Sequence, residues 1–202
     1  SSRLDFHTLY EAWDPLGNTA LRLDVPDWEG WSPGAREAVQ LFRGELQPPT
    51  PVYLPGYMGS RPMDVMWSGL VPVCVISARV DALLRDAGVT GWGTYPVAVY
   101  DRHGEPLPGY LGLSITGRAG PQDRSRGQVV QLPPIVPGAQ PPVVRRGVYF
   151  DEASWDGSDM FLLGGSLMWV TTERVKRLLT RAKIRNLRFT PLDEVEISVR
   201  LD

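Results

Sequence analysis

Val75-Ile76-Ser77-Ala78-Arg79-Val80-Asp81-Ala82-Leu83-Leu84-Arg85-Asp86-Ala87-Gly88-Val89 occurs in this chain a second time, in altered form, 95 positions later. The second copy reads Val170-Thr171-Thr172-Glu173-Arg174-Val175-Lys176-Arg177-Leu178-Leu179-Thr180-Arg181-Ala182-Lys183-Ile184. Arg79, Val80, Leu83, Leu84, Ala87 and the later Pro96 recur as Arg174, Val175, Leu178, Leu179, Ala182 and Pro191. Ser77 and Val89 return conservatively as Thr172 and Ile184.

Each copy predicts a strand, a helix and a second strand. A short apolar run meets a hydroxyl residue that can cap a helix, and apolar residues then recur at helical spacing. Two copies are too few for a solenoid, so we interpret them as two halves of one fold or two small similar subdomains. A third helix is predicted to begin at Ser32-Pro33, with Ser32 as its cap, and to end at Gly44. The sequence therefore predicts an α+β fold with about three helices and a mostly antiparallel sheet.

The composition is that of an ordinary globular chain. Of its 202 residues 43% are hydrophobic and 22% charged, and the formal net charge is -2. This balance argues against wholesale nucleic-acid binding but leaves local basic patches open. The single cysteine, Cys74, lies in an apolar run and is interpreted as a buried small hydrophobe, which fits a reducing compartment. Because neither a transmembrane run nor a signal-peptide core is present, we expect a cytoplasmic protein without membrane contact.

Four segments are expected along the chain. Residues 1–60 form an N-terminal strand and helix that pack on the core, and residues 61–116 form the first half. Residues 117–142 form a linker loop rich in proline and glycine, and residues 143–202 form the second half, within one compact unit. Five prolines also predict a loop over residues 47–62. Gly164-Gly165 predicts a hairpin, and Asn186 is expected to end the last helix.

Residues typical of catalysis or metal binding are sparse. Of the two histidines, His7 lies near one end and His103 lies in a predicted turn, and neither has an obvious partner. HExxH and CxxC are absent, as are GxxxxGK[ST] and a GxGxxG that opens a helix, so we expect no metal and no cofactor. One enzymatic alternative stays open, a small hydrolase or transferase in which His103 works with an acid.

An acidic loop with tryptophans is one candidate surface for a partner. Its carboxylates could bind a basic partner, although Asx turns and helix capping are their more common duty. Trp92 and Trp155, which lie among glycines or aspartates in turns, are the tryptophans that we expect to be exposed anchors. The candidate binding residues of this surface are Asp151, Glu152, Trp155, Asp156, Asp159 and Trp92.

The second copy of the repeat offers an alternative, basic surface. Its helix and the following loop carry seven basic residues between Arg174 and Arg188 and no acid. Such a run is usually a solvated helix face, but it could also bind phosphates or an acidic protein. The candidate residues are Arg174, Arg177, Arg181 and Arg185. Binding of nucleic acid through them is kept as an alternative function.

Three stretches carry a family resemblance, namely Asp156-Gly157-Ser158-Asp159-Met160-Phe161, residues 169–179 and residues 184–192. They resemble the C-terminal part of a bacterial polymorphic-toxin immunity protein family. The first repeat, with Asp64 before it and Gly109-Tyr110 after it, resembles the middle section of that family. The likeness spans about Pro62 to Ile197.

This resemblance implies a non-enzymatic inhibitor that binds a cognate protein toxin and blocks its active site. No catalytic residue is carried over by the resemblance. The acidic loop would suit a toxin with a basic, nucleic-acid-binding cleft, and the basic helix would suit an acidic toxin. The identity of the toxin and the oligomeric state stay open.

Overall fold

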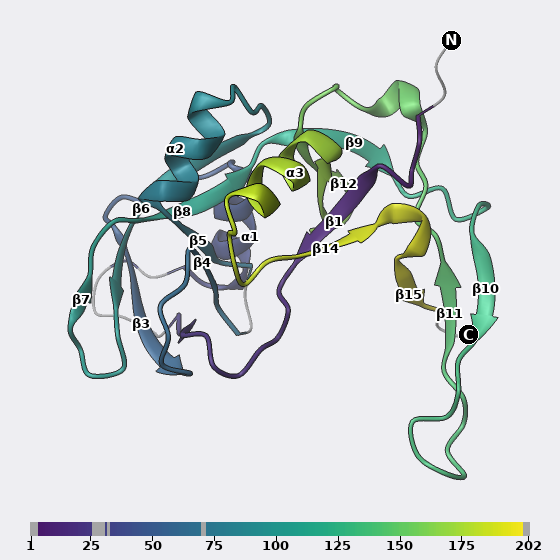
Figure 1. Cartoon of the computed structure of the whole chain (residues 1–202), viewed down its shortest axis with the longest axis horizontal. Coiled ribbons are helices and arrows are strands. Elements are labelled where there is room, and N and C mark those ends of the chain that lie inside the picture. The colour runs from purple at the N-terminus through teal and green to yellow at the C-terminus, as the bar shows by residue number, and fades with distance from the viewer. Residues whose placement is uncertain (1–3, 26–30, 32, 70–71, 200–202) are drawn as a thin grey trace.

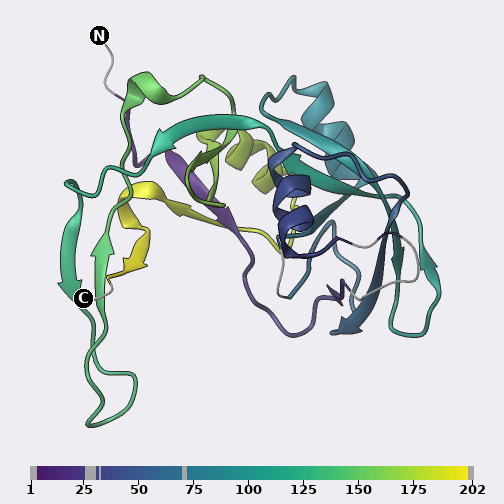
Figure 2. The same ribbon diagram turned by 180° about the vertical axis from the view of Figure 1, so that it is seen from behind.

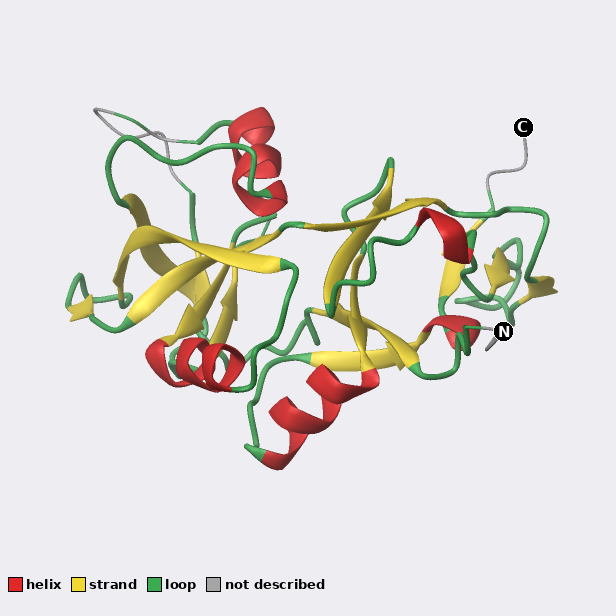
Figure 3. Ribbon diagram, turned by 90° about the horizontal axis from the view of Figure 1, so that it is seen from above, coloured by secondary structure: helices red, strands yellow, loops and turns green. Residues whose placement is uncertain are grey.

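The computed structural model describes residues 4–25, 31, 33–69 and 72–199, and within them the fold is α+β, as predicted. Two curved β-sheets lie side by side along the long axis of the molecule, with helices packed on them (Figures 1 and 3). A smaller three-stranded sheet is attached to the end of the second half (Figure 1). No helix in the described part of the chain is long and apolar enough to span a membrane.

The three helices of the described residues are α1 (Ala35–Arg43), α2 (Ala78–Asp86) and α3 (Glu173–Arg181), and two 3-10 turns are η1 (Glu152–Ser154) and η2 (Leu192–Glu194). The strands up to residue 115 are β1 (Leu9–Trp13), β2 (Arg22–Leu23), β3 (Val52–Met58), β4 (Val65–Trp67), β5 (Cys74–Ser77), β6 (Trp92–Tyr100), β7 (Pro106–Leu107) and β8 (Tyr110–Ile115). The later strands are β9 (Gly117–Pro121), β10 (Gln128–Gln131), β11 (Val143–Arg146), β12 (Met160–Gly164), β13 (Trp169–Thr172), β14 (Arg188–Pro191) and β15 (Glu196–Ser198).

The two repeat copies fold alike. In each, an antiparallel strand pair, β4–β5 or β12–β13, runs directly into a helix, α2 or α3. Ser77 caps α2 by accepting a hydrogen bond from the backbone N–H of Val80 at 3.3 Å. Thr172 holds the equivalent position before α3 but directs its hydroxyl to Asp159 instead. The repeat seen in the sequence is therefore a repeat of structure.

The second sheet takes strands from outside its own half of the chain, whereas the first sheet takes none from residues 143–199. The first sheet has the order β2-β3-β6-β8-β5-β4, and the second has the order β14-β1-β13-β12-β9. The N-terminal strand β1 lies between β14 and β13, in the position that β8 takes between β6 and β5. From β8 the chain continues into β9 and crosses to pair with β12 (Figures 1 and 2). The N-terminal segment thus contributes β1 to the second sheet and β2 to the first.

Alternation along the strands divides the apolar residues among three cores. In β5, Cys74 and Ile76 face a central core between the two sheets, whereas Val75 faces the core of the first sheet. In β12, Met160 and Leu162 face the central core, and their neighbours face the core of the second sheet. Successive side chains of a strand point to opposite faces. One strand of each repeat therefore contributes side chains both to the core of its own sheet and to the central core between the two sheets.

Cys74 is buried as the sequence predicts. Burial raises the pKa of its thiol well above the ordinary value, since the thiolate loses its hydration in apolar surroundings. The interpretation of Cys74 as a small hydrophobe is therefore supported.

Several local predictions need correction. Residues 47–62 contain the strand β3, which accommodates Pro55 because the carbonyl of Pro55 still accepts a hydrogen bond from Asp24 N–H at 2.8 Å. The segment 117–142, predicted to be a linker, contains β9 and β10, and only residues 132–142 form a projecting loop (Figure 1).

Two helix ends also differ from the prediction. The cap of α1 is Gly34, so this helix begins later than predicted, and the predicted cap Ser32 lies outside the described residues. The αL cap Gly44 ends α1 as predicted. Lys183, with a φ of 56°, turns the chain after α3 three residues before Asn186, which has a φ of 67°.

Gly112 provides a test of the packing between β6 and β8. It lies opposite Tyr95, and a Cβ at Gly112 would meet the ring of Tyr95 at 2.1 Å. We expect Gly112→Ala to lower the free energy of unfolding by about 1–3 kcal/mol, since the buried ring cannot move aside. Gly93, on the same strand pair, has nothing within 4 Å of a built Cβ. Gly93→Ala should therefore change stability by less than about 1 kcal/mol. Urea unfolding measures both, and equal losses would contradict the packing argument.

Candidate protein-binding surface

Two arginines connect α2 and α3 through hydrogen bonds. Arg79 donates a hydrogen bond to the carbonyl of Ala182 at the end of α3. Arg174 donates a hydrogen bond of 2.6 Å to the carbonyl of Ala87 at the end of α2. Since 79 and 174, like 87 and 182, are separated by 95 positions, the two bonds are equivalent across the repeat. Each arginine thus satisfies a carbonyl that a helix end leaves without an intrahelical partner.

Each of these arginines is in turn held by an aspartate that precedes its strand pair. Arg79 pairs with Asp64 at 2.9 Å, and Arg174 pairs with Asp159 at 2.6 Å. Asp64 also accepts from the hydroxyl of Ser77, and Asp159 accepts from that of Thr172, at 2.7 and 3.1 Å. We call Asp64, Arg79, Asp159 and Arg174 the arginine clamp.

A groove of about 480 Å³ lies beside the clamp, between α2 and α3. Ala87 and Leu178 supply its apolar surface, and Glu173, Arg174, Arg177 and Arg181 supply its polar surface. Arg177 has 63% of its side chain exposed and forms an ion pair with Glu173 at 3.2 Å within the helix. Such an exposed i,i+4 pair is weak and leaves most of the guanidinium open to a partner.

The basic candidates divide into two groups. Arg174 is engaged in the clamp and is therefore structural. Arg177 and Arg181 line the groove, and Arg185 lies exposed in the loop after α3. The structure thus brings Arg177 and Arg181 together at one apolar groove.

The acidic candidates are held by internal hydrogen bonds. Asp151 caps η1 by accepting from Ala153 N–H at 3.1 Å. Glu152 accepts from the backbone of Leu4, also at 3.1 Å. Asp156 accepts from the hydroxyl of Ser158 at 2.5 Å and from Arg118 N–H at 2.9 Å. These are the capping and Asx-turn duties that short acidic side chains commonly have.

The pKa values of two of these carboxyls reflect the same bonds. Burial tends to raise the pKa of Asp159, but hydrogen bonds from Arg174, Thr90 and Thr172 outweigh it and hold the pKa below the ordinary value. Burial likewise opposes the hydrogen bonds from Ser158 and Arg118 that lower the pKa of Asp156. Both carboxylates are stabilised in the charged form by contacts inside the protein.

The two tryptophans that were expected to be exposed anchors are partly buried. Trp92 donates through Nε1 to the carbonyl of Val89 at 2.8 Å, and the guanidinium of Arg85 lies 5.2 Å from its ring centroid. Trp155 packs against Phe161, with the ring centroids 5.3 Å apart. Neither is an exposed turn residue, because Trp92 begins β6 and packs on the central core, and Trp155 follows η1 and packs on the core of the second sheet.

The histidines are both exposed. His103 lies in the turn between β6 and β7, where its backbone N–H donates to Asp101 at 2.8 Å. This position is a solvent-exposed turn and not the pocket that a hydrolase using His103 requires. His7 has a partner that the sequence did not indicate, since its Nδ1 lies 3.1 Å from Asp193. The hydrogen bond to Asp193 raises the pKa of His7, and with Glu194 these residues form the one cluster in the described chain whose geometry could hold a metal.

No family model matches the chain, and no curated protein matches it. The function of the groove is therefore argued from its own chemistry and from the resemblance described above.

The clamp was not predicted from the sequence, although the sequence carries a signal for it. Asp64 and Asp159 stand 95 positions apart, as the two arginines do, and each precedes a strand pair of the repeat. A carboxylate and an arginine that recur together in a duplicated unit indicate a shared structural ion pair. The extension of the repeat to these aspartates could therefore have been found from the sequence.

Asp159→Asn tests the clamp through its pH dependence. Because the pKa of Asp159 is lowered in the folded state, its stabilisation is full above the ordinary aspartate pKa of about 3.9 and is lost as the pH falls below it. At neutral pH we expect Asp159→Asn to reduce the free energy of unfolding by about 1.5–3 kcal/mol, the range for hydrogen bonds to charged groups. The difference from the parent protein should shrink as the pH falls through the acid range. Urea unfolding as a function of pH measures it.

Asp86→Asn is the matched control, because Asp86 is exposed at the end of α2. It should stay within about 0.5 kcal/mol of the parent protein. A loss of stability in Asp159→Asn that is the same at every pH would contradict the role of the charged carboxylate.

Proposed function

We propose that the protein is a non-catalytic immunity protein that neutralises a bacterial toxin by binding it through the groove between α2 and α3. The observation that carries this proposal is the groove itself, where exposed Arg177 and Arg181 surround the apolar Leu178 and Ala87. An apolar centre with arginines at its margin is the composition that protein interfaces favour. The resemblance to polymorphic-toxin immunity proteins supports a toxin as the partner.

The arginine clamp supports the proposal because it makes the surface rigid. Both helix ends beside the groove are bonded to the opposite helix, and the side chains beneath them, Val80, Leu84, Val175 and Leu179, are buried in the central core. A binding surface that is already ordered loses less entropy on association than a flexible one does. An inhibitor that must capture a toxin quickly and hold it benefits from this order.

The charge of the groove indicates the chemistry of the partner. Arg177 and Arg181 carry positive charge at the groove, although the whole chain has a formal charge of -2. Attraction is therefore local, and it favours an acidic segment of the partner with an apolar side chain beside it. Of the two surfaces that the sequence left open, the basic one is the better supported, because the carboxylates of the acidic loop are engaged inside the protein.

Nucleic acid is the second candidate partner, since the same arginines could bind phosphates. It would be distinguished by a steep decrease of affinity with salt, caused by release of counterions from the nucleic acid. The apolar Leu178 and Ala87 in the lining of the groove favour a protein partner instead. As the resemblance implies, we place the proposed inhibitor in the cytoplasm.

Charge reversal at the groove tests the proposed function. The partner used in the test is a candidate toxin, chosen as the product of a gene that neighbours the gene of this protein, co-expressed with it and purified through a tag on one chain. We expect Arg177→Glu combined with Arg181→Glu to weaken the complex by at least about ten-fold, chiefly through slower association, and to abolish growth rescue. Association rates and growth of the toxin-expressing strain are the measurements.

The control reverses two arginines away from the groove, Arg102→Glu with Arg124→Glu, which changes the net charge by the same amount. Both residues are exposed. This control should bind and rescue growth as the parent protein does. If the groove variant still rescues growth fully, or if only duplex or single-stranded DNA binds, with a steep salt dependence, the proposal is wrong.

A further inference from the structure

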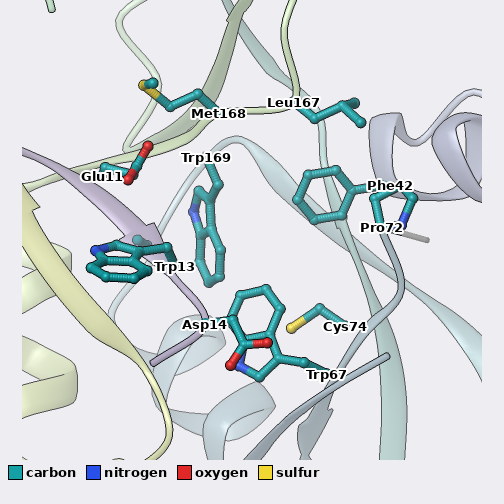
Figure 4. Close-up of a pocket in the computed structure, with 11 residues that line it drawn as sticks. Glu11, Trp13, Asp14, Phe42, Trp67, Pro72, Cys74, Leu167, Met168 and Trp169 are labelled. Carbon is teal, nitrogen blue, oxygen red and sulfur yellow. The ribbon is translucent and has the colours of Figure 1, made fainter. Parts of the chain in front are cut away.

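A second cavity lies where the two sheets meet, and it shares no lining residue with the groove of the proposed toxin surface. It has a volume of about 200 Å³ and is open to the outside. Aromatic rings form its walls: Trp13 from β1, Trp67 from β4, Trp169 from β13 and Phe42 from α1 (Figure 4). The rings of Trp67 and Trp169 are tilted by 45° with their centroids 6.3 Å apart. Residues from both halves are therefore needed to make it.

The wall of the cavity contains one buried hydrogen-bond donor without a partner. Trp169 is 3% exposed, and its Nε1–H has no partner among the described residues. The neighbouring indoles differ, since Trp13 donates to Thr190 Oγ1 and Trp67 donates to the carbonyl of Asn186, both at 2.9 Å. Figure 4 shows the nitrogen of Trp169 on the ring edge directed toward Glu11 and Trp13. A buried donor left unmatched is costly, and a ligand oxygen would satisfy it.

The cavity also contains an uncompensated carboxylate. Glu11 lies opposite Val170, the residue after Trp169, and its side chain lines the cavity without an ion pair among the described residues. Burial raises the pKa of Glu11, because the carboxylate loses hydration. The other charged residue of the lining, Asp14, is already paired with Arg22 at 2.6 Å. Both charged lining residues are thus acidic, and only Glu11 lacks a counter-charge.

Aromatic walls with one free carboxylate favour a particular kind of cation. The faces of tryptophan rings attract cations, most strongly where water is excluded. A primary ammonium would need three acceptors for its three protons, and the cavity supplies one free carboxylate. A quaternary ammonium needs none and presents methyl groups to the rings. The guanidinium of Arg188 lies 5.1 Å from the ring centroid of Trp13. Arg188 is not among the residues that line the cavity, so its guanidinium does not occupy the place proposed for the ligand.

We propose that this cavity binds a small quaternary alkylammonium molecule, with its cationic head among Trp13, Trp67 and Trp169 beside Glu11 and an oxygen of the same molecule accepting from Trp169 Nε1–H. The volume suits such a molecule, because it is smaller than the roughly 300–1,000 Å³ of pockets for drug-sized ligands. This site is separate from the groove between α2 and α3, so its failure and the failure of the toxin proposal are independent.

Choline is the probe, and its neutral isostere 3,3-dimethylbutan-1-ol is the matched comparison. Titration of each into the whole chain is followed by the indole N–H signals in nuclear magnetic resonance and by tryptophan fluorescence. We expect choline to bind at least about ten-fold more tightly than the neutral isostere, and to shift the N–H signal of Trp169. Glu11→Gln, which keeps the size of the side chain, should remove most of that ten-fold preference.

Glu105→Gln is the control variant, since Glu105 is exposed in the turn between β6 and β7. It should bind choline as the parent protein does. Equal affinity for choline and its neutral isostere would overturn the proposal, and so would an unmoved Trp169 signal. Tighter binding of n-butylammonium than of choline would also overturn it, because a primary amine would then be the preferred ligand.

Discussion

The arginine clamp is the interaction on which the arrangement of the two halves depends. Arg79 and Arg174 each connect the start of one helix to the end of the other, and each is anchored by an aspartate from its own half. As ion pairs with partly exposed arginines, the two salt bridges contribute little energy by themselves. Their value is geometric, because they satisfy helix carbonyls and fix α2 against α3 above the central core.

Strands from outside the second half join the two halves into one molecule. The second repeat copy does not close its own sheet, because β1 and β9 complete it, whereas β8 closes the first sheet within the first half. The central core takes alternate residues from β5 and β12, and the aromatic cavity takes rings from both halves. Both proposed sites therefore lie where the two halves contact each other. The groove lies between the two helices, and the cavity lies between the two sheets. A duplicated unit creates such places because the copies pack on each other.

The local sequence predicted the repeat elements well and the connections poorly. Hydroxyl caps, helical apolar spacing and Gly164-Gly165 were sufficient to predict α2, α3 and the β12–β13 hairpin. Proline counts led to a loop where β3 lies, since a proline that lacks N–H can still offer its carbonyl to a neighbouring strand. Of the candidate site residues, Arg177 and Arg181 meet at a groove, whereas Asp156 and Asp159 serve internal bonds.

By itself the sequence determined the class of the fold, its duplication, the burial of Cys74 and the basic face of α3, because these follow from spacing along a short stretch. Only the tertiary structure decided which charges are free and which aromatic rings meet. The charges of Asp159 and Arg174 compensate each other in an ion pair between the segment before β12 and the helix α3. The rings of Trp13, Trp67 and Trp169 come together from three strands. The physical reason is that charge compensation and cavity formation depend on distances in space. The pairing of the N-terminal β1 with β13 and β14 makes these distances unrelated to distances along the chain.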